Sequence, residues 1–160
     1  MIRIVELRAE NRAYAVRFMA ELQEHERQIS PDRCPGEDIA DEHLTYLEHV
    51  CSVNSGKIFL ALSDQEYCGF IVCFLNSYDH NDLHITPALK TYGEISDLYI
   101  APHCRRRGVV RDLLRHAEKY LTSIGQRRVK LTVLNSNASA RHVYENLGYT
   151  PYEVIYQKEL

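Results

Sequence analysis

The chain has 160 residues, the length of one ordinary globular domain, and we expect a single domain over residues 1–160. Hydrophobic residues make up 45% and charged residues 26% of the chain, which is typical of folded soluble proteins and excludes the collagen-like, disordered and coiled-coil classes. Nineteen Lys and Arg residues against 22 Asp and Glu residues give a net charge of −3, which disfavours a general binder of nucleic acid or of acidic membranes.

The absence of targeting signals and the pattern of cysteines predict a cytoplasmic protein. The first residues contain no apolar stretch long enough for a signal peptide, and the longest uncharged apolar run, residues 67–75, is too short to span a membrane. The cysteines are odd in number and form no C-x-x-C pair, which argues against a disulfide framework and a zinc knuckle. We expect free thiols at Cys34, Cys51, Cys68, Cys73 and Cys104.

The N-terminal third predicts a strand followed by two helices. Residues 2–7 alternate apolar and charged side chains, as a half-buried strand does. Two amphipathic helices follow, separated by the breaker residues of segment 30–36, and each carries apolar residues at helical spacing. These residues are Ala15, Phe18, Met19 and Leu22 in the first helix, and Ala40, Leu44, Leu47 and Cys51 in the second.

The rest of the chain alternates strands and helices. A hairpin of two apolar strands, 57–63 and 67–78, precedes a polar loop and a strand over 92–101 that Pro102 ends. A long helix ending at Gly125, a strand over 129–134, a short helix over 137–147 and a last strand over 152–158 complete the pattern. This order predicts an α/β fold in which a mixed sheet has helices on both faces.

The basic loop between the strand over 92–101 and the long helix favours phosphate binding. Such a turn exposes unpaired backbone N–H groups at the positive end of a helix dipole, and Gly108 lets a ligand approach the main chain closely. Three consecutive arginines, Arg105, Arg106 and Arg107, raise the local potential. The pattern is neither G-x-G-x-x-G nor a P-loop, which argues against a dinucleotide fold and a nucleotide triphosphatase. The structural alternative is an exposed basic loop that only caps a helix.

Two motifs in this region resemble those of the GNAT superfamily of N-acetyltransferases. The loop 105–110 is similar to the pyrophosphate signature Q/R-x-x-G-x-G/A, with Arg105 and Gly108 in matching positions. Val110 departs from the signature. A side chain at this position would crowd the diphosphate, so we expect either that the helix sits slightly differently or that the affinity for coenzyme A is altered. Residues 137–149 resemble the second motif, in which Asn-Ala opens a helix and a Tyr precedes Leu-Gly-Phe/Tyr.

The resemblance implies a fold, a cosubstrate and a binding site. The fold is the GNAT-like acyl-CoA N-acyltransferase fold, a mostly antiparallel sheet splayed between its fourth and fifth strands, and acetyl-CoA is the acyl donor, with no metal. The pantetheine arm lies along Leu98, Tyr99 and Ile100, and Asn137 either contacts this arm or caps its helix. The residues expected at the pyrophosphate are Arg105, Arg106, Arg107, Gly108, Val109, Val110 and Arg111.

The resemblance also implies two catalytic side chains. Tyr144 is the general acid that protonates the departing thiolate, and the alternative is a core aromatic on the apolar face of its helix. The attacking amine must lose a proton to a base, directly or through water. Glu94 is the first candidate, since it matches the position of a catalytic glutamate counted back from Arg105. Asp97 is the second candidate, although strict strand alternation places it on the opposite face from Glu94.

Other residue groups are weaker candidates. Segment 79–84 contains metal-ligand residue types, but a flexible polar loop accounts for them, and we propose no metal. Cys104 is a conceivable acetyl acceptor in a ping-pong scheme, yet no histidine is placed by the sequence to activate it, and His103 cannot easily face the same point. Direct transfer in a ternary complex is favoured.

Two opposed charge blocks suggest the acceptor. Residues 21–48 hold nine acidic residues against two arginines, a net charge of −7, and residues 103–130 hold nine basic against two acidic residues, a net of +7. The basic block suits the phosphates of coenzyme A. If the acidic block, residues 21–48, forms a wall of the acceptor site, it suits a cationic amine. The alternative is that both blocks are solvated helix faces.

The sequence therefore favours an N-acetyltransferase that acts on a primary amine, either a small cationic molecule or a lysine or N-terminal amine. A non-catalytic acyl-CoA-binding or protein-interaction module of the same fold is the competing class. Nucleic-acid binding through the arginine loop is a third, and it predicts a steep dependence on salt. A homodimer in which the final strand pairs between two copies remains open.

Overall fold

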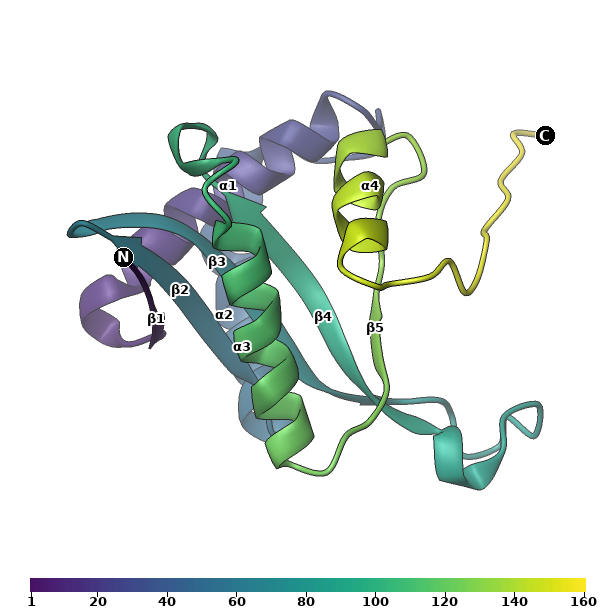
Figure 1. Ribbon diagram of the computed structural model, residues 1–160. Helices are drawn as coiled ribbons and strands as arrows, with labels where there is room; N and C mark the ends of the chain where they lie inside the picture. The colour runs from purple at the N-terminus through teal and green to yellow at the C-terminus, as the bar shows by residue number, and fades with distance from the viewer.

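The computed structural model describes residues 1–160 and shows a five-stranded sheet covered by helices on both faces (Figure 1). The strands are β1 (Ile2–Glu6), β2 (Lys57–Ser63), β3 (Glu66–Ser77), β4 (Thr91–Ile100) and β5 (Val129–Leu131). The helices are α1 (Arg12–Arg27), α2 (Gly36–Val53), α3 (Val109–Ser123) and α4 (Ala138–Asn146). The spatial order of the strands is their order in the chain, and all neighbours are antiparallel except the parallel pair β4 and β5. The predicted mixed α/β sheet is confirmed.

Two apolar layers hold the helices on the sheet. On one face α1 and α2 bury Phe18 and Leu44 against Phe70 of β3, and on the other face α3 buries Leu113 against Ile71 of the same strand. Each of these large side chains is fully buried and contributes about 1.5–3 kcal/mol relative to exposure. The apolar run in β3 is therefore explained by burial on both faces.

The sheet opens between β4 and β5. The two strands pair only from Gly93 to Ile95 against Val129 to Leu131, although β4 continues to Ile100. Gly93 lies directly under α3, since a Cβ there would stand 2.7 Å from a methyl carbon of Leu121. The predicted splaying is confirmed, and one edge of β4 is left unpaired from residue 96 onwards.

A β-bulge in β4 changes which side chains share a face. Val72 of β3 pairs with Asp97 and the next residue pairs with Ile95, so Ser96 is an extra residue without a partner. Asp97 and Glu94 therefore both lie opposite β3 residues of the α1/α2 face, Val72 and Phe74. The expectation that Asp97 faces away from Glu94 is wrong, because it assumed strict alternation across an irregular strand.

The predicted last strand, residues 152–158, is also wrong. Residues 151–160 have no regular structure and are exposed, and in Figure 1 the C-terminal segment runs away from the sheet beyond α4. Alternating apolar side chains are insufficient for a strand, because its backbone groups need a paired neighbour. The nearest strand, β5, spans three residues and offers too few partners. None of the helices is long and apolar enough to cross a membrane.

Candidate active site

The loop between β4 and α3 presents a row of backbone donors. The N–H groups of residues 106–111 donate no hydrogen bond to any backbone carbonyl. Arg106 and Gly108 adopt left-handed conformations, with φ of 62° and 82°, and Gly108 is the residue that precedes the first turn of α3. Alternation of left- and right-handed residues turns successive N–H groups toward one side, which forms a concave site for an anion at the positive end of a helix dipole.

Side chains of the loop add positive charge around the row of backbone N–H groups. The Arg105 Nε donates to the carbonyl of Ile100 at 3.1 Å, and its guanidinium lies 5.9 Å from the centre of the Tyr99 ring. Arg106 and Arg107 are exposed. Val110, the residue that departs from the signature, is half-buried against the apolar cluster under α3. Its side chain thus has a packing role, and its N–H group remains among the free donors.

Tyr144 of α4 packs on the α3 face of the sheet. Its ring packs against the same apolar cluster as Leu98 and Ile100. Burial raises the pKa of Tyr144 to about 12, so its hydroxyl is protonated at neutral pH. The neighbouring Tyr149 is committed elsewhere, since its hydroxyl donates to a Glu118 carboxylate oxygen at 2.7 Å.

Asn137 has the capping role that was one of its two predicted roles. Its side-chain oxygen accepts a hydrogen bond from the backbone N–H of Ala140 at 3.2 Å, at the start of α4. A further contact with a cosubstrate remains a prediction.

Glu94 and Asp97 form an acidic pair along β4. The Asn76 side-chain amide donates to Glu94, and the Ser96 hydroxyl donates to Asp97 at 2.6 Å. On its other side Asp97 lies 3.8 Å from Nε2 of His43, which α2 contributes. The Asp97 carboxylate raises the pKa of His43 above its ordinary value of 6.5, more than burial lowers it. The two candidate bases thus share one face, and Asp97 is tied to α2.

His43 was missed by the sequence analysis, and so was a cluster of tyrosines around Lys130. His43 lies beside Leu44 at the border of the apolar face of α2, which is the signal that was available. The ammonium of Lys130 lies 4.3–4.5 Å from the ring centres of three tyrosines, and Lys130 is the β5 partner of Glu94. These rings belong to Tyr78, Tyr92 and Tyr152.

Most of the acidic block on α1 and α2 is neutralised within the chain. Arg12 of α1 binds Asp41 at 2.6 Å and Glu48 at 2.9 Å, so it joins the two helices. Six of the nine acidic residues take part in ion pairs, namely Glu21, Glu24, Glu26, Asp32, Asp41 and Glu48. Glu37, Asp38 and Glu42 are left without such a partner. The negative charge that the acidic block offers to an acceptor is therefore smaller than the net charge of −7 suggests.

Cys104 is buried, and its surroundings differ from expectation. His103 does face the same point, because a His103 ring nitrogen, the Cys104 sulfur and a Glu66 carboxylate oxygen all lie within 4.8 Å of one another. The expectation that the two neighbours diverge is wrong, since the tight 3-10 turn Pro102–Cys104 brings both side chains to one side.

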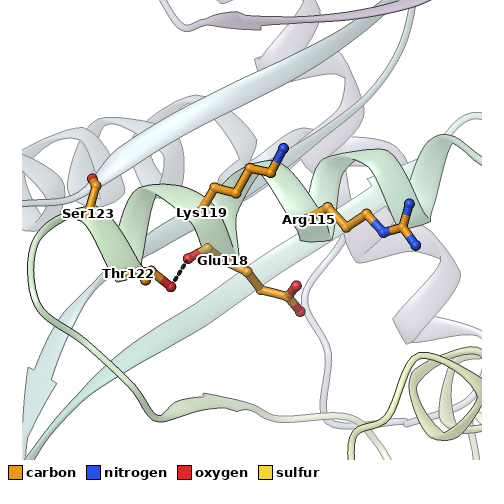
Figure 2. Close-up of a pocket in the computed structure, with 5 residues that line it drawn as sticks. All are labelled: Arg115, Glu118, Lys119, Thr122 and Ser123. Atoms are coloured by element: carbon orange, nitrogen blue, oxygen red, sulfur yellow. Dashed lines mark hydrogen bonds between the residues drawn. The ribbon is translucent and has the colours of Figure 1, made fainter.

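Two surface depressions lie near these elements. One has a volume of about 560 Å³ between α1 and the end of β4, and its walls include Glu21, Tyr99 and Arg105. The other is a polar depression on the outer face of α3, where Figure 2 shows that the Thr122 hydroxyl donates to the Glu118 carbonyl. It lies on the opposite side of the sheet from Glu94 and Asp97, and no candidate residue lines it.

A match to one protein family covers the loop between β4 and α3, the strands β4 and β5 and the helix that carries Tyr144. The description of the acetyltransferase (GNAT) family matches residues 16–149, which include both motifs. The chain belongs to this family. GNAT acetyltransferases use acetyl-CoA as the acyl donor.

Several known GNAT proteins resemble the chain. It is 38% identical over 55 residues to a streptothricin acetyltransferase from Streptomyces lavendulae, over 34% of this chain but only 29% of that protein. Among solved structures, a putative acetyl transferase from Pyrococcus furiosus is 22% identical with a TM-score of 0.72, covering 100% of both chains. An aminoglycoside 6′-N-acetyltransferase from Acinetobacter baumannii is 15% identical with a TM-score of 0.72, covering 100% of this chain and 99% of the other. At these identities the solved structures support the fold.

Proposed function

We propose that this GNAT acetyltransferase transfers the acetyl group of acetyl-CoA to a primary amine of a small cationic molecule, by direct attack in a ternary complex. The observation that carries the proposal is the bulge at Ser96. It places Glu94 and Asp97 on one face of β4, where the sheet begins to open.

The cosubstrate would bind along the opening. The free N–H groups of residues 106–111 and the adjacent arginines would hold the pyrophosphate, because both donate to an anion. The pantetheine arm would pair with the open edge of β4 over Leu98, Tyr99 and Ile100, which supplies partners for backbone groups that the sheet leaves unpaired. Asn137, at the start of α4, would border this arm.

The chemistry then needs proton transfers at the nitrogen and at the sulfur. Glu94, oriented by Asn76, would take a proton from the ammonium of the acceptor directly or through a water molecule, so that the neutral nitrogen attacks the thioester carbon. Tyr144 would give its phenolic proton to the sulfur as the carbon–sulfur bond breaks. The second proton of the nitrogen would leave through water as the amide forms and would restore the phenol of Tyr144. These steps use only side chains of the chain and require no metal ion.

Two observations support a cationic acceptor. Glu94 and Asp97 add two carboxylates at the site, and three acidic residues of α2, Glu37, Asp38 and Glu42, have no ion-pair partner. A relative is named a streptothricin acetyltransferase and a structural neighbour an aminoglycoside acetyltransferase. Attack within a ternary complex is favoured over an acetyl-cysteine intermediate, because Cys104 is buried with 1% exposure.

The test is a thiol-release assay with acetyl-CoA and a panel of acceptors: streptothricin, aminoglycosides, polyamines, lysine-containing peptides and neutral amines. We expect the highest kcat/KM for a small polycation at low salt, and a fall of about 100-fold or more in Glu94→Gln. The matched control is Glu10→Gln, an exposed glutamate outside the site, which should leave kcat/KM unchanged. Equal rates for neutral and cationic amines, or full activity of Glu94→Gln, would overturn the proposal.

A further inference from the structure

We propose that Glu66, His103 and Cys104 form a binding site for a zinc-like divalent cation beside the phosphate-binding loop. The three side chains supply one oxygen, one nitrogen and one sulfur ligand, and these atoms all lie within 4.8 Å of one another. The site uses none of the residues assigned to acetyl transfer.

Three local features of the fold bring these ligands together. The β2–β3 hairpin turns at Asp64 and Gln65, whose φ values of 49° and 70° direct Glu66 into the first position of β3. Two residues later Cys68 is an extra residue in a bulge, since Ala61 pairs with Gly69 and the next β2 residue pairs with Tyr67. Bulges of this kind often redirect side chains next to functional sites.

The bulge is then joined to the loop that follows β4. The carbonyl of Cys68 accepts the backbone N–H of Ala101 at 2.8 Å, so the residue before the 3-10 turn Pro102–Cys104 is fixed against β3. The turn then presents His103 and Cys104 toward Glu66. Two segments that are far apart in sequence thus hold the ligands at a defined separation.

The spacing is close to that of a tetrahedral metal site. With Zn–S bonds of about 2.3 Å and Zn–N bonds of about 2.0 Å, neighbouring ligand atoms stand about 3.5 Å apart. Nε2 of His103 already lies 2.9 Å from a Glu66 carboxylate oxygen, and both of these side chains are exposed and able to adjust. An ordinary ion pair accounts for that contact alone, but it does not account for the third donor, the Cys104 sulfur.

The packing around Cys104 fixes the position of its sulfur. Its side chain is 1% exposed and held in place by the apolar cluster under α3. The Cys68 thiol donates to the carbonyl of Glu66 at 3.7 Å, which ties the bulge to the backbone of a second ligand residue. Both contacts limit the movement of the ligands.

The donor set identifies the class of cation. Sulfur and imidazole ligands favour zinc and similar transition-metal ions, whereas Mg²⁺ and Ca²⁺ prefer oxygen ligands. Three protein ligands leave the fourth tetrahedral position open. That position would face the depression of about 560 Å³ between α1 and β4, because Glu66 and His103 both line it.

The test uses the reduced full-length protein without acetyl-CoA and Co²⁺ as a spectroscopic probe. We expect one equivalent of Co²⁺ to produce the visible absorption of a tetrahedral site and a sulfur-to-cobalt charge-transfer band, and Zn²⁺ to displace it. Cys104→Ser should remove the charge-transfer band. His103→Ala and Glu66→Gln should each weaken Zn²⁺ binding more than tenfold in calorimetry.

Two variants serve as matched controls. Cys34→Ser changes an exposed thiol elsewhere, and His84→Ala changes the polar loop over 79–84, so both should keep wild-type binding. Because Cys104 is buried and its variant is at risk of unfolding, the surface variants His103→Ala and Glu66→Gln are decisive by themselves. The proposal is overturned if no thiolate band forms, or if binding survives in both surface variants. It is equally overturned if the signal disappears in Cys34→Ser.

Discussion

Tyr144 has the two properties that a proton donor to a leaving thiolate requires. Its hydroxyl is protonated at neutral pH, because burial raises its pKa to about 12, and its ring packs against the cluster that holds Leu98 and Ile100 of β4. Tyr144→Phe keeps the ring that packs and removes only the hydroxyl group, which is the proton donor. We expect kcat to fall about 100-fold or more, with the dissociation constant for coenzyme A unchanged, as measured by steady-state kinetics and calorimetry.

The neighbouring Tyr149 provides the control for this variant. Tyr149→Phe removes a hydrogen bond to the Glu118 carboxylate and should cost about 1.5–3 kcal/mol of unfolding free energy. It should not lower kcat, since this hydroxyl is already committed to α3. If Tyr144→Phe turned over at the wild-type rate, Tyr144 would be a packing residue and the acid would lie elsewhere.

At the level of single residues, the sequence predicted what local motifs encode. Arg105, Gly108 and Tyr144 lie in two short signatures, so their positions follow from spacing along the chain. His43 and Lys130 were missed because their roles depend on contacts between distant segments. His43 meets Asp97 across the α2–β4 packing, and Lys130 meets tyrosines from three segments.

At the level of elements, the sequence pattern predicts the bounds of β4 but not the directions of all its side chains. Its bounds were predicted within a residue, but strict alternation placed Asp97 on the wrong face. One extra residue, Ser96, reverses the side-chain direction for everything that follows it. No periodicity in the sequence marks such a bulge, because Ser96 is compatible with either arrangement.

The contact between α2 and β4 makes a prediction about pH. The nearby Asp97 carboxylate raises the pKa of His43 above 6.5, so the folded protein holds this proton more tightly than the unfolded chain. The resulting stabilisation is fully present below about pH 6.5, the pKa of an unperturbed histidine, and is lost as the pH rises through the folded pKa of His43. In Asp97→Asn we expect the NMR-titrated pKa of His43 to fall toward 6.5. The difference in unfolding free energy between wild type and Asp97→Asn should become smaller from pH 6 to pH 8.

His116 of α3 is an internal control for that titration. Burial lowers the pKa of His116 below 6.5, and this residue packs against Phe59 on the other face of the sheet. Asp97→Asn should therefore leave the titration of His116 unchanged. A wild-type His43 that titrates at or below 6.5 would show that the α2–β4 contact is not an ionic one.

At the level of the whole molecule, the net charge of −3 is the remainder of two opposed blocks that the fold treats differently. Acidic residues of α1 and α2 mostly pair within the chain, through Arg12 and Arg33 among others. The three arginines of the loop between β4 and α3, Arg105, Arg106 and Arg107, form no ion pair. Most of the acidic charge is thus neutralised within the chain, whereas the positive charge of this loop stays free for the anion that we propose it binds.

The C-terminal segment offers a test of the whole-chain arrangement. Residues 153–160 are exposed, and a hydrogen bond of 3.3 Å from the Tyr78 hydroxyl to the Glu153 carboxylate joins them to the rest of the chain. Deleting residues 153–160 retains Tyr152, whose ring lies 4.8 Å from Arg128 and 4.5 Å from Lys130. We therefore expect the deletion to change the unfolding free energy by less than about 1 kcal/mol, measured by chemical denaturation.

The same deletion decides whether the apolar residues of this segment make contacts between two copies of the chain. Val154, Ile155 and Tyr156 are 67%, 88% and 92% exposed, a pattern that pairing with a second copy would bury. Light scattering of the full chain and of the deletion should give the same number of subunits if the segment is free. A dimer that dissociates on deletion would show that the segment forms a strand between two copies. A loss of unfolding free energy above about 2 kcal/mol would point the same way, because removing a free, exposed segment costs less. Ile155→Asp in the full chain separates these cases, since it is neutral on a free segment and disruptive in a paired strand.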